Sequence, residues 1–278
     1  MNIAIKYPAS KILQDLGLYY IFSSQEAGGH YQYQSLPATN LCLTIYKANT
    51  VQTRVSRSEN TCIIHPGSKV HSRLYGFHKK QLDVTVHGEM DQVCVIFQAG
   101  GLRLFTRVPY GELMPETDVL GLLFGQQGAS LAERLFATEQ TAARVAVLDA
   151  FLSKALQENR RQLNIDRLVS QLDRQPANSR VVSLAATENK DTSTLYRHFK
   201  QYVGQSPKEY LKVIRFRRAL KALLHRRYLS LTELAYDLGY YDQSHFIKDF
   251  TQITDCNPGL IHQVTTVVQE ELVLIPRS

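Results

Sequence analysis

The feature that most restricts the fold of this chain is an internal repeat in its C-terminal third. The same series of apolar, turn and proline positions occurs twice, with an offset of 50 or 51 residues throughout. Duplicated spacing implies two copies of one supersecondary unit. We therefore expect two related helical units between residues 180 and 262. The repeated positions are Leu184-Ala185, Leu195, Phe199, Gly204 and Pro207 in the first copy, and Leu234-Ala235, Phe246, Phe250, Asp255 and Pro258 in the second.

The second copy has the start and stop signals of a helix-turn-helix. Ser230-Leu-Thr-Glu233 fits a capping box, in which Ser230 caps the helix and Glu233 reaches back. Gly239 then ends this first helix, because glycine adopts a positive φ at little cost. Asp242 is suited to cap the next helix, whose buried side carries Phe246 and Phe250. Two short helices joined by a glycine turn are the helix-turn-helix layout.

The first copy follows the same plan with substitutions. Leu184-Ala185-Ala186 would form the inner face of its first helix. Asn189 takes the place of the turn glycine, and asparagine tolerates left-handed geometry better than most residues. Asp191 would cap the second helix, with Leu195 and Phe199 facing inward.

The second helix of each unit presents hydroxyl, amide and cationic side chains on its outward face. Such groups read base edges or hold phosphates when a helix enters a major groove. Arg197 suits a bidentate contact to guanine, and Gln243 one to adenine. Other roles remain open for most members, namely helix capping (Ser193, Thr194), packing (Tyr196, His245) and phosphate contact (Lys200, Lys248). The candidate DNA-binding residues are Ser193, Thr194, Tyr196, Arg197 and Lys200, and Gln243, Ser244, His245 and Lys248.

Residues 206–224 predict one long helix between the two units. Ser206 suits the N-cap, and Pro207 the first helical position. A rigid helix here favours both reading helices entering successive major-groove turns on one face of DNA, about 34 Å apart. Some of its basic residues would then touch the DNA backbone. These residues are Lys212, Arg215, Arg217, Arg218 and Lys221.

The charge distribution agrees with a nucleic-acid binder attached to a neutral domain. The chain has 278 residues and a formal net charge of +7. Residues 1–150 hold 13 basic and 12 acidic side chains, whereas residues 190–227 hold 11 basic and only two acidic ones. A neutral first half followed by a basic segment is typical of a sensor or partner domain joined to a nucleic-acid binder. A solvated helix face would give the same local charge.

The N-terminal part indicates strands first and helices afterwards, so the whole chain is expected to be α+β. Short β-branched or aromatic runs at 41–46, 82–87 and 92–97 alternate with glycine, proline and asparagine sites, which favours an antiparallel sandwich or barrel over residues 1–115. Apolar residues then recur at helical spacing, which predicts two or three helices over 118–172. Their apolar stripe would pack on the sheet or, alternatively, form a dimer seam.

We therefore expect two domains. Residues 1–172 would form a sensing or regulatory domain, and residues 180–278 an all-α DNA-binding domain of two helix-turn-helix units joined by a long helix. The polar segment 173–179, which contains Pro176, is the candidate linker. The tail after His262 is apolar enough to pack as a further helical turn or as an edge strand.

The bulk composition indicates a soluble protein without a prosthetic group. No apolar run is long enough to span a membrane and no signal peptide is evident, so we expect a cytoplasmic protein without membrane contact. The four cysteines are widely spaced and form no CxxC pair, so we expect buried thiols and no metal site. We also expect no cofactor.

Residues 180–262 closely resemble the DNA-binding domain of AraC/XylS-family transcription regulators. The resemblance rests on the repeated positions above together with Leu195-Tyr-Arg-His-Phe-Lys200, Gly204-Gln-Ser-Pro207, Leu238-Gly-Tyr240 and Ser244-His-Phe246. The chain departs from the family pattern at Thr251, where a cation is usual, at Asp255-Cys-Asn-Pro258, where Gly-x-Ser-Pro is usual, and at Ile261-His262, where Tyr-Arg is usual. These departures weaken the case for phosphate contacts at the far end of the second unit.

The N-terminal residues resemble, more weakly, the sensing domains attached to such regulators. Val95-Ile-Phe-Gln-Ala-Gly-Gly-Leu102, Leu113 and Arg144…Leu148…Phe151-Leu152 carry this likeness. It implies a regulator of transcription that binds double-stranded DNA in the major groove and responds to a small-molecule effector, with RNA polymerase as a further partner. A homodimer would gain affinity at paired sites. The alternative is a regulator without a ligand that acts through a partner.

An enzyme is the remaining rival. His65, His71, His78 and His87 lie in the region of a cupin-like barrel, where histidines hold a metal. Their spacings lack the close His-x-His arrangement with a following glutamate that such a site needs. No nucleophile elbow, phosphate-binding loop or paired-carboxylate motif occurs either. We therefore expect no catalytic residues.

Overall fold

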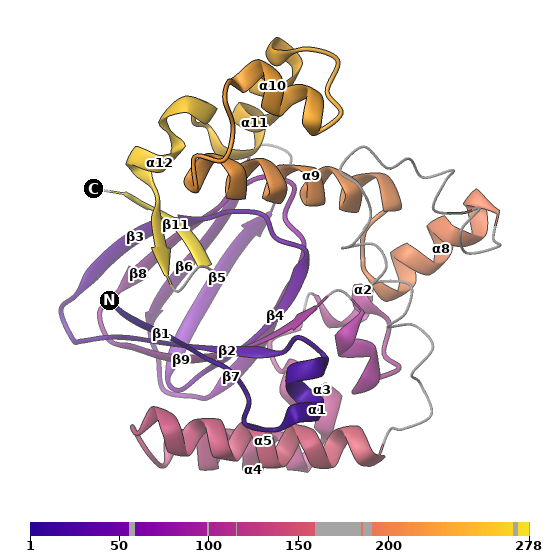
Figure 1. Cartoon of the computed structure of the whole chain (residues 1–278). Coiled ribbons are helices and arrows are strands. Elements are labelled where there is room, and N and C mark those ends of the chain that lie inside the picture. Colours follow the sequence, from indigo (N-terminus) through magenta and orange to yellow (C-terminus); the bar gives the residue numbers. More distant parts are fainter. Residues whose placement is uncertain are drawn as a thin grey trace.

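The computed structural model describes residues 1–55, 59–98, 100–114, 116–158, 185, 191–268 and 272–277. In the described part of the chain, two sheets lie between one group of helices beneath them and a second helical group above them (Figure 1). The predicted linker 173–179, the turn residue Asn189 and the predicted helical residues 159–172 lie outside the described residues. The same holds for the domain boundary that they were expected to mark.

The strand-rich N-terminal part forms a sandwich, as predicted. One sheet has the order β1-β2-β9-β4-β7 and the other the order β10-β11-β3-β8-β6-β5. All pairs are antiparallel except β6 with β8. The strands of this part are β1 (Asn2–Lys6), β2 (Tyr19–Gln25), β3 (His30–Ser35), β4 (Asn40–Tyr46), β5 (Asn49–Val55), β6 (Asn60–Pro66), β7 (His71–Tyr75), β8 (Leu82–His87) and β9 (Met90–Gln98).

Period-two alternation divides the first sheet into two faces. On β4 and β9, Leu41, Leu43, Val95 and Phe97 belong to the core shared with the helices. Their neighbours Cys42, Thr44, Cys94 and Ile96 line a cavity on the opposite face, between the sheets. The same two strands therefore build both the main core and the cavity wall.

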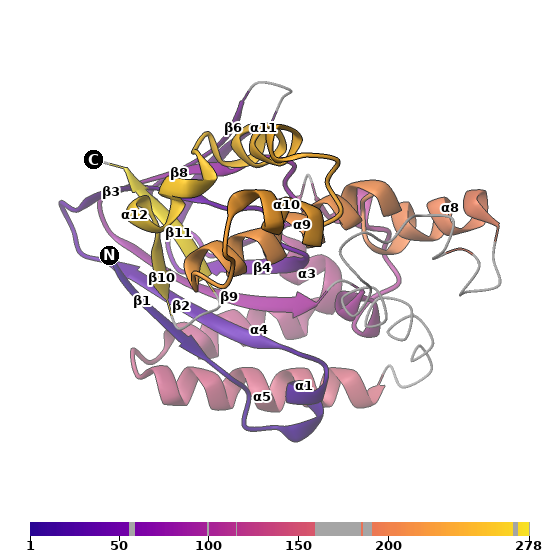
Figure 2. The same cartoon turned by 45° about the horizontal axis from the view of Figure 1, so that its top comes forward.

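The helices after the sandwich cover the outer face of the first sheet (Figures 1 and 2). The apolar stripe of these helices packs into one core with the strands, through Leu131, Leu135, Leu148 and Leu152. Of the two predicted alternatives, packing on the sheet or a dimer interface, the structure has the first. The helices of the N-terminal part are α1 (Lys11–Asp15), α2 (Tyr110–Leu113), α3 (Val119–Phe124), α4 (Gln126–Phe136) and α5 (Thr141–Glu158), with a short 3-10 helix at Gly101–Leu104.

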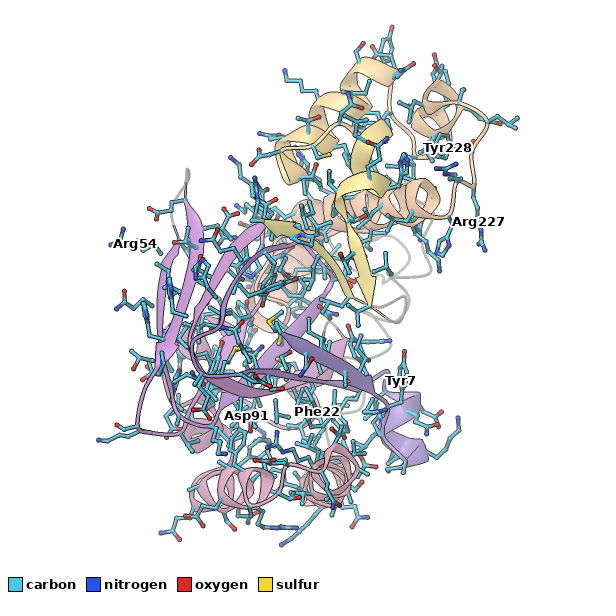
Figure 3. All side chains as sticks on the ribbon, turned by 90° about the vertical axis from the view of Figure 1, so that its left-hand side faces the viewer. Tyr7, Phe22, Arg54, Asp91, Arg227 and Tyr228 are labelled. Atoms are coloured by element: carbon cyan, nitrogen blue, oxygen red, sulfur yellow. The ribbon has the colours of Figure 1, made fainter. Side chains whose placement is uncertain are left out.

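Two buried polar anchors hold α5 under the sandwich. The Arg144 guanidinium donates to both carboxylate oxygens of Asp91 at 2.7 Å, which is a bidentate pair. Figure 3 shows Asp91 and Phe22 at the base of the sheet facing these helices. One turn further along α5, Asp149 accepts hydrogen bonds from the Tyr20 hydroxyl and from the backbone of Ala9. Arg144, which carried part of the resemblance, thus has a structural role.

The C-terminal part contains the predicted helices and a hairpin in addition. Its elements are α8 (Thr192–Tyr202), α9 (Pro207–Leu224), α10 (Leu231–Asp237), α11 (Gln243–Thr254), a 3-10 helix at Pro258–Leu260, α12 (Ile261–Val264), β10 (Thr266–Val268) and β11 (Leu272–Arg277). The tail forms a helical turn and then a hairpin, in which β10 is the edge strand of the sheet and β11 lies between β10 and β3. β11 pairs with β3, with Leu274 opposite Ser35 and Arg277 opposite Gln32. This part of the chain is therefore helical up to Val264 and joins the N-terminal sheet beyond it.

Candidate DNA-binding surface

The second unit is a helix-turn-helix made of α10 and α11. The Ser230 hydroxyl accepts from the Glu233 backbone N–H at 3.1 Å, and the Glu233 carboxylate reaches back to the N–H of Leu229 rather than to that of Ser230. Gly239 has the left-handed φ of +74° that its place in the turn requires. Asp242 caps α11 by accepting from the His245 N–H at 2.7 Å. The Ser230 cap, the Gly239 turn and the Asp242 cap are therefore as predicted, whereas the reciprocal half of the predicted capping box goes to Leu229 instead of Ser230.

An aromatic core fixes the register of this unit. Phe246 is fully buried, and its ring lies 5.4 Å from that of Tyr240 and 5.9 Å from that of Phe250. These residues, Ala235 and Leu36 of the N-terminal part belong to one hydrophobic cluster. Because Phe246 and Phe250 face inward, the opposite face of α11 is turned outward.

The first unit is described from Asp191 onward, together with Ala185. Asp191 accepts from the Thr194 hydroxyl at 2.7 Å and from the Thr194 N–H at 2.8 Å, and the hydroxyl contact is the main reason that the pKa of Asp191 is lowered. Leu195 and Phe199 are buried in a separate small core with Tyr210. The Asp191 cap and the inward-facing residues of α8 are as predicted.

The candidate reading residues are divided between the exposed faces of α8 and α11. Ser193, Tyr196, Arg197 and Lys200 are exposed on α8, and Ser244, His245 and Lys248 are exposed on α11. The two sets do not converge on one spot, because α9 separates the units (Figure 1). At 18 residues, α9 is about 27 Å long. Successive major-groove turns on one face of DNA lie about 34 Å apart, which is of the same order as this length.

Some candidates are already engaged within the protein. The Thr194 hydroxyl belongs to the α8 cap, and its oxygen also accepts from Arg197 at 3.4 Å. Gln243 accepts a hydrogen bond of 2.6 Å from Thr232 on α10, which orients its amide. The His245 ring stands edge-on to Tyr240 at 5.3 Å. These contacts hold the side chains in place at the surface.

The long helix between the two units, α9, begins with a complete capping box. The Ser206 hydroxyl accepts from the Glu209 N–H, and the Glu209 carboxylate accepts from the Ser206 N–H at 3.0 Å. Partial burial alone would raise the pKa of Glu209. Hydrogen bonds from Lys79 and Ser206 and the charge of Lys200 outweigh that effect and lower the pKa to about 2.

Several of the basic residues of α9, some of which were expected to touch the DNA backbone, have partners inside the molecule. Lys212 donates to Asp249 of α11 at 3.1 Å, and the Arg215 guanidinium lies 5.0 Å from the centre of the Tyr240 ring. Arg217 lines the cavity between the sheets. The positions of these basic residues in the sequence could not distinguish them from exposed ones. An amphipathic helix that packs on two sides buries part of its polar face, and the sequence does not show which part.

Exposed residues outside the two reading helices were missed. Lys208 borders the same shallow surface as Tyr196 and Arg197. Arg226 and Arg227 are exposed in the loop between α9 and α10, where Figure 3 shows Arg227 at the edge of the molecule. Tyr241 is 86% exposed directly before the α11 cap. The clustered arginines after an apolar helix were a signal available in the sequence.

The departures from the family pattern after α11 have a local structural explanation. Asp255 ends α11 with a φ of +52°, so it adopts the left-handed conformation that Gly204, at +83°, adopts after α8. Asn257 then caps the following 3-10 helix by accepting from the Gly259 N–H. Aspartate and asparagine thus do the work of the usual glycine and serine, and the fold of the second unit is retained.

One segment of the N-terminal part, residues 76–81, contacts both units. Phe77 packs edge-on against Tyr210 at 5.9 Å, and Lys79 forms an ion pair of 2.5 Å with Glu209. Gln81 donates its side-chain amide to the Asp255 carboxylate and its backbone N–H to the carbonyl of Ile253 at 3.1 Å. This segment is called the bridging loop below.

The histidines proposed for a metal site are dispersed over different environments. His71 stacks on Tyr46, whereas His65 stacks on His87 with ring centres 4.7 Å apart. His78 is enclosed beside the cavity, and its burial lowers its pKa to about 4. No group of three or more potential ligands that could hold a metal ion occurs among the described residues. No helix in the described part of the chain is long and apolar enough to span a bilayer.

Comparison with known proteins identifies the C-terminal region. Residues 184–262 match the family model described as "Helix-turn-helix domain". The lactose operon transcription activator of Staphylococcus xylosus is 39% identical over 72 residues, and the HTH-type transcriptional activator RhaS of Salmonella arizonae is 37% identical over 70. By this match, residues 184–262 are similar to a helix-turn-helix domain. Each match covers 25% of the relative's length.

Solved structures give more distant likenesses. ToxT from Vibrio cholerae aligns with 87% of this chain and 96% of its own, at 13% identity and a TM-score of 0.42. The C-terminal domain of AraT, a response regulator from Geobacillus stearothermophilus, covers 37% of this chain and 86% of its own, at 24% identity and a TM-score of 0.33.

Proposed function

We propose that this protein is a sequence-specific DNA-binding regulator of transcription. The observation that carries the proposal is the pair of capped helices, α8 and α11, which present exposed hydroxyl, amide and cationic side chains from the two ends of α9. Relatives of this region are transcription activators by name. Arg197 would read a guanine and Gln243 an adenine, with Lys200 and Lys248 on phosphates.

We further propose that the N-terminal domain regulates this binding through a small-molecule effector. Two features support the proposal. A cavity lies between the sheets, and β11 of the C-terminal part forms part of its wall. The bridging loop carries His78 at that cavity and contacts α9 and the end of α11. Binding of a ligand in the cavity would therefore be able to alter the contacts that the bridging loop makes with α9 and with the end of α11.

The remaining partners follow from the proposed activity. RNA polymerase is a partner for a protein of this class that activates transcription. A homodimer would bind paired sites more tightly through effective concentration. The protein would act in the cytoplasm, where bacterial-type regulators meet DNA, and the chemistry would be binding rather than catalysis.

Selection of duplexes from a random pool with the full chain tests the DNA-binding role. The proposal expects enrichment of one sequence family, and binding that weakens steeply with salt, since phosphate contacts release counterions. Arg197→Ala should relax the preference at one position, whereas Tyr7→Ala, at an exposed residue of the N-terminal part, should not. Equal binding of enriched and random duplexes would refute the proposal.

A further inference from the structure

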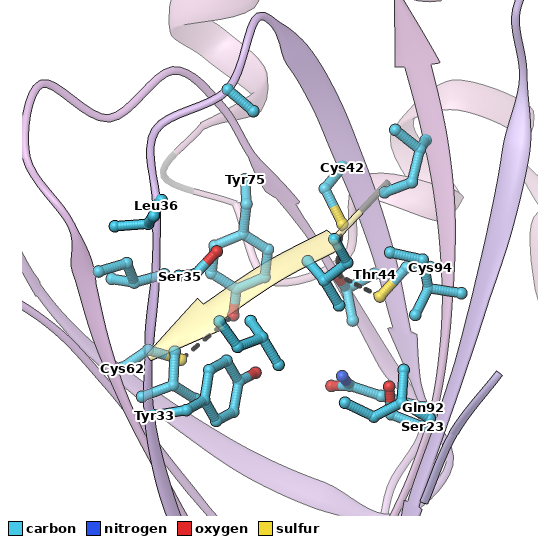
Figure 4. Close-up of a pocket in the computed structure, with 18 of the residues that line it drawn as sticks. Ser23, Tyr33, Ser35, Leu36, Cys42, Thr44, Cys62, Tyr75, Gln92 and Cys94 are labelled. Carbon is cyan, nitrogen blue, oxygen red and sulfur yellow. Dashed lines mark hydrogen bonds between the residues drawn. The ribbon is translucent and has the colours of Figure 1, made fainter. Parts of the chain in front are cut away.

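The cavity between the sheets has the size of a small ring compound. Its volume is about 160 Å³. Inner-face side chains of β2, β3, β4, β6 and β9 line it, and Val273 and Leu274 of β11 form one side (Figure 4). An apolar protein cavity of roughly 150 Å³ binds benzene. The space here therefore suits a molecule of about six to ten non-hydrogen atoms.

The charge of the wall favours an uncharged ligand. Among the described residues that line the cavity, none is an aspartate or glutamate, so a cation would find no counterion. His78 is neutral near pH 7 because burial lowers its pKa. Arg217 lies at the border with a second hollow and already interacts elsewhere in the protein. Burial of a charge without a partner is costly, so a neutral ligand fits this wall best.

A buried side-chain carbonyl in the wall, that of Gln92, lacks a hydrogen-bond donor within the described part of the chain. Several other polar groups of the wall pair with one another: the Tyr46 and Tyr75 hydroxyls at 2.9 Å, and the Thr44 hydroxyl with Cys94 at 3.4 Å. The Gln92 residue is 7% exposed, and its Oε1 atom has no hydrogen-bond partner among the described residues. Figure 4 shows the Tyr33 hydroxyl directed toward Gln92. A buried carbonyl without a donor is destabilising, so a ligand that supplies one gains affinity.

We propose that this cavity binds a simple uncharged phenol. The ligand hydroxyl would donate to Gln92 Oε1 and accept from the Tyr33 hydroxyl, and the ring would lie among Tyr33, Tyr46 and Tyr75, where aromatic rings pack favourably. The inference rests on the proposed function in one respect, namely that the bound phenol is the effector. Because β11 lies against the cavity, occupancy would change how firmly the C-terminal strand is held.

Thermal melting of the full chain with three small aromatic probes tests the ligand class. Phenol has the ring and the hydroxyl, toluene has the ring alone, and benzoate adds a negative charge. We expect phenol at about ten times its dissociation constant to raise the melting temperature by about 3–6 °C. Benzoate at the same concentration should raise it less. A greater rise with benzoate, or none with phenol, would overturn the proposal.

Two variants test the assigned contacts. In Gln92→Leu the affinity for phenol relative to toluene should fall about tenfold, since the acceptor is gone. Tyr33→Phe, which removes only a hydroxyl, should shift the same ratio in the same direction and covers the case in which Gln92→Leu does not fold. Gln127→Leu, at an exposed site on α4, is the matched control and should leave the ratio unchanged. An unchanged ratio in both cavity variants would overturn the assigned contacts.

Selected duplex DNA, titrated with and without phenol, separates this inference from the proposed function. Sequence-specific DNA binding without any phenol stabilisation would refute the ligand alone. Phenol stabilisation in a chain that binds no DNA specifically would retain the ligand site and refute the regulator. Altered DNA affinity in phenol, lost in Gln92→Leu, is the result expected if both hold.

Discussion

Replacement of Phe246 by alanine should destabilise the second helix-turn-helix unit and the C-terminal strand β11 together. Phe246 is fully buried between the rings of Tyr240 and Phe250, so its truncation leaves a cavity that costs about 3–5 kcal/mol. At about 2–4 °C per kcal/mol for a chain of this size, the melting temperature should fall by roughly 6–20 °C. Tyr241→Ala, at the exposed position next to Tyr240, is the control and should change the free energy of unfolding by no more than about 0.5 kcal/mol.

Native-state hydrogen exchange shows where that loss falls. Val273 and Ile275 of β11 share a hydrophobic cluster with Phe246, whereas the described core of the first unit is a separate cluster around Phe199. Backbone amides of α10, α11 and β11 should therefore exchange faster in Phe246→Ala, while those of α8 keep their protection. Equal loss of protection in α8, or an unchanged melting curve, would show that the assigned packing is wrong.

Three further predictions concern base reading, pH and the bridging loop. Arg197→Ala should cost about 1–3 kcal/mol at one base position, whereas Lys248→Ala should weaken binding to all duplexes alike and reduce the salt slope by about one, as measured by fluorescence anisotropy. Burial lowers the pKa of His78 to about 4 in the folded protein. As the pH falls, His78 is therefore protonated in the unfolded chain at a higher pH than in the folded one. Stability should therefore fall by at most about 3 kcal/mol as the pH drops from about 6.5 to 4, and denaturant titrations of His78→Gln should lack that part of the slope. Asp255→Gly should remove the contact with Gln81 but also relieve a left-handed φ worth about 1–2 kcal/mol. It should therefore leave the melting temperature nearly unchanged, while limited proteolysis cuts the bridging loop faster. An unaltered rate of cleavage would show that the contact between Gln81 and Asp255 does not hold the bridging loop in place.

Local features of the C-terminal units could be predicted from the sequence, because they depend on neighbours in the chain. The caps at Asp191, Ser206 and Asp242 and the turn at Gly239 are each determined within four residues. The short β-branched or aromatic runs of β4 and β9 predicted strands for the same reason. Helix packing on the sheet was one of two predicted outcomes, and the structure selects it.

Long-range features could not be predicted in the same way. The apolar run at 272–275 left a helical turn and an edge strand both open, and it does not name β3 as a partner, because pairing depends on which edge is free in the folded sandwich. Lys212 and Arg215 look like DNA contacts in the sequence, but the fold places Asp249 of α11 beside Lys212 and Tyr240 of the turn before α11 beside Arg215. Gln92 is unremarkable in the sequence, and only the two-sheet arrangement buries its carbonyl at a cavity.

The central claim is that two units held by α9 read one face of a DNA duplex. Hydroxyl-radical footprinting of the full chain on its selected duplex tests this most directly. The account predicts two protected patches about 10 base pairs apart on the same face. Insertion of about five base pairs between them, which turns one patch to the opposite face, should abolish joint protection. A single patch, or joint protection that survives the insertion, would contradict the account.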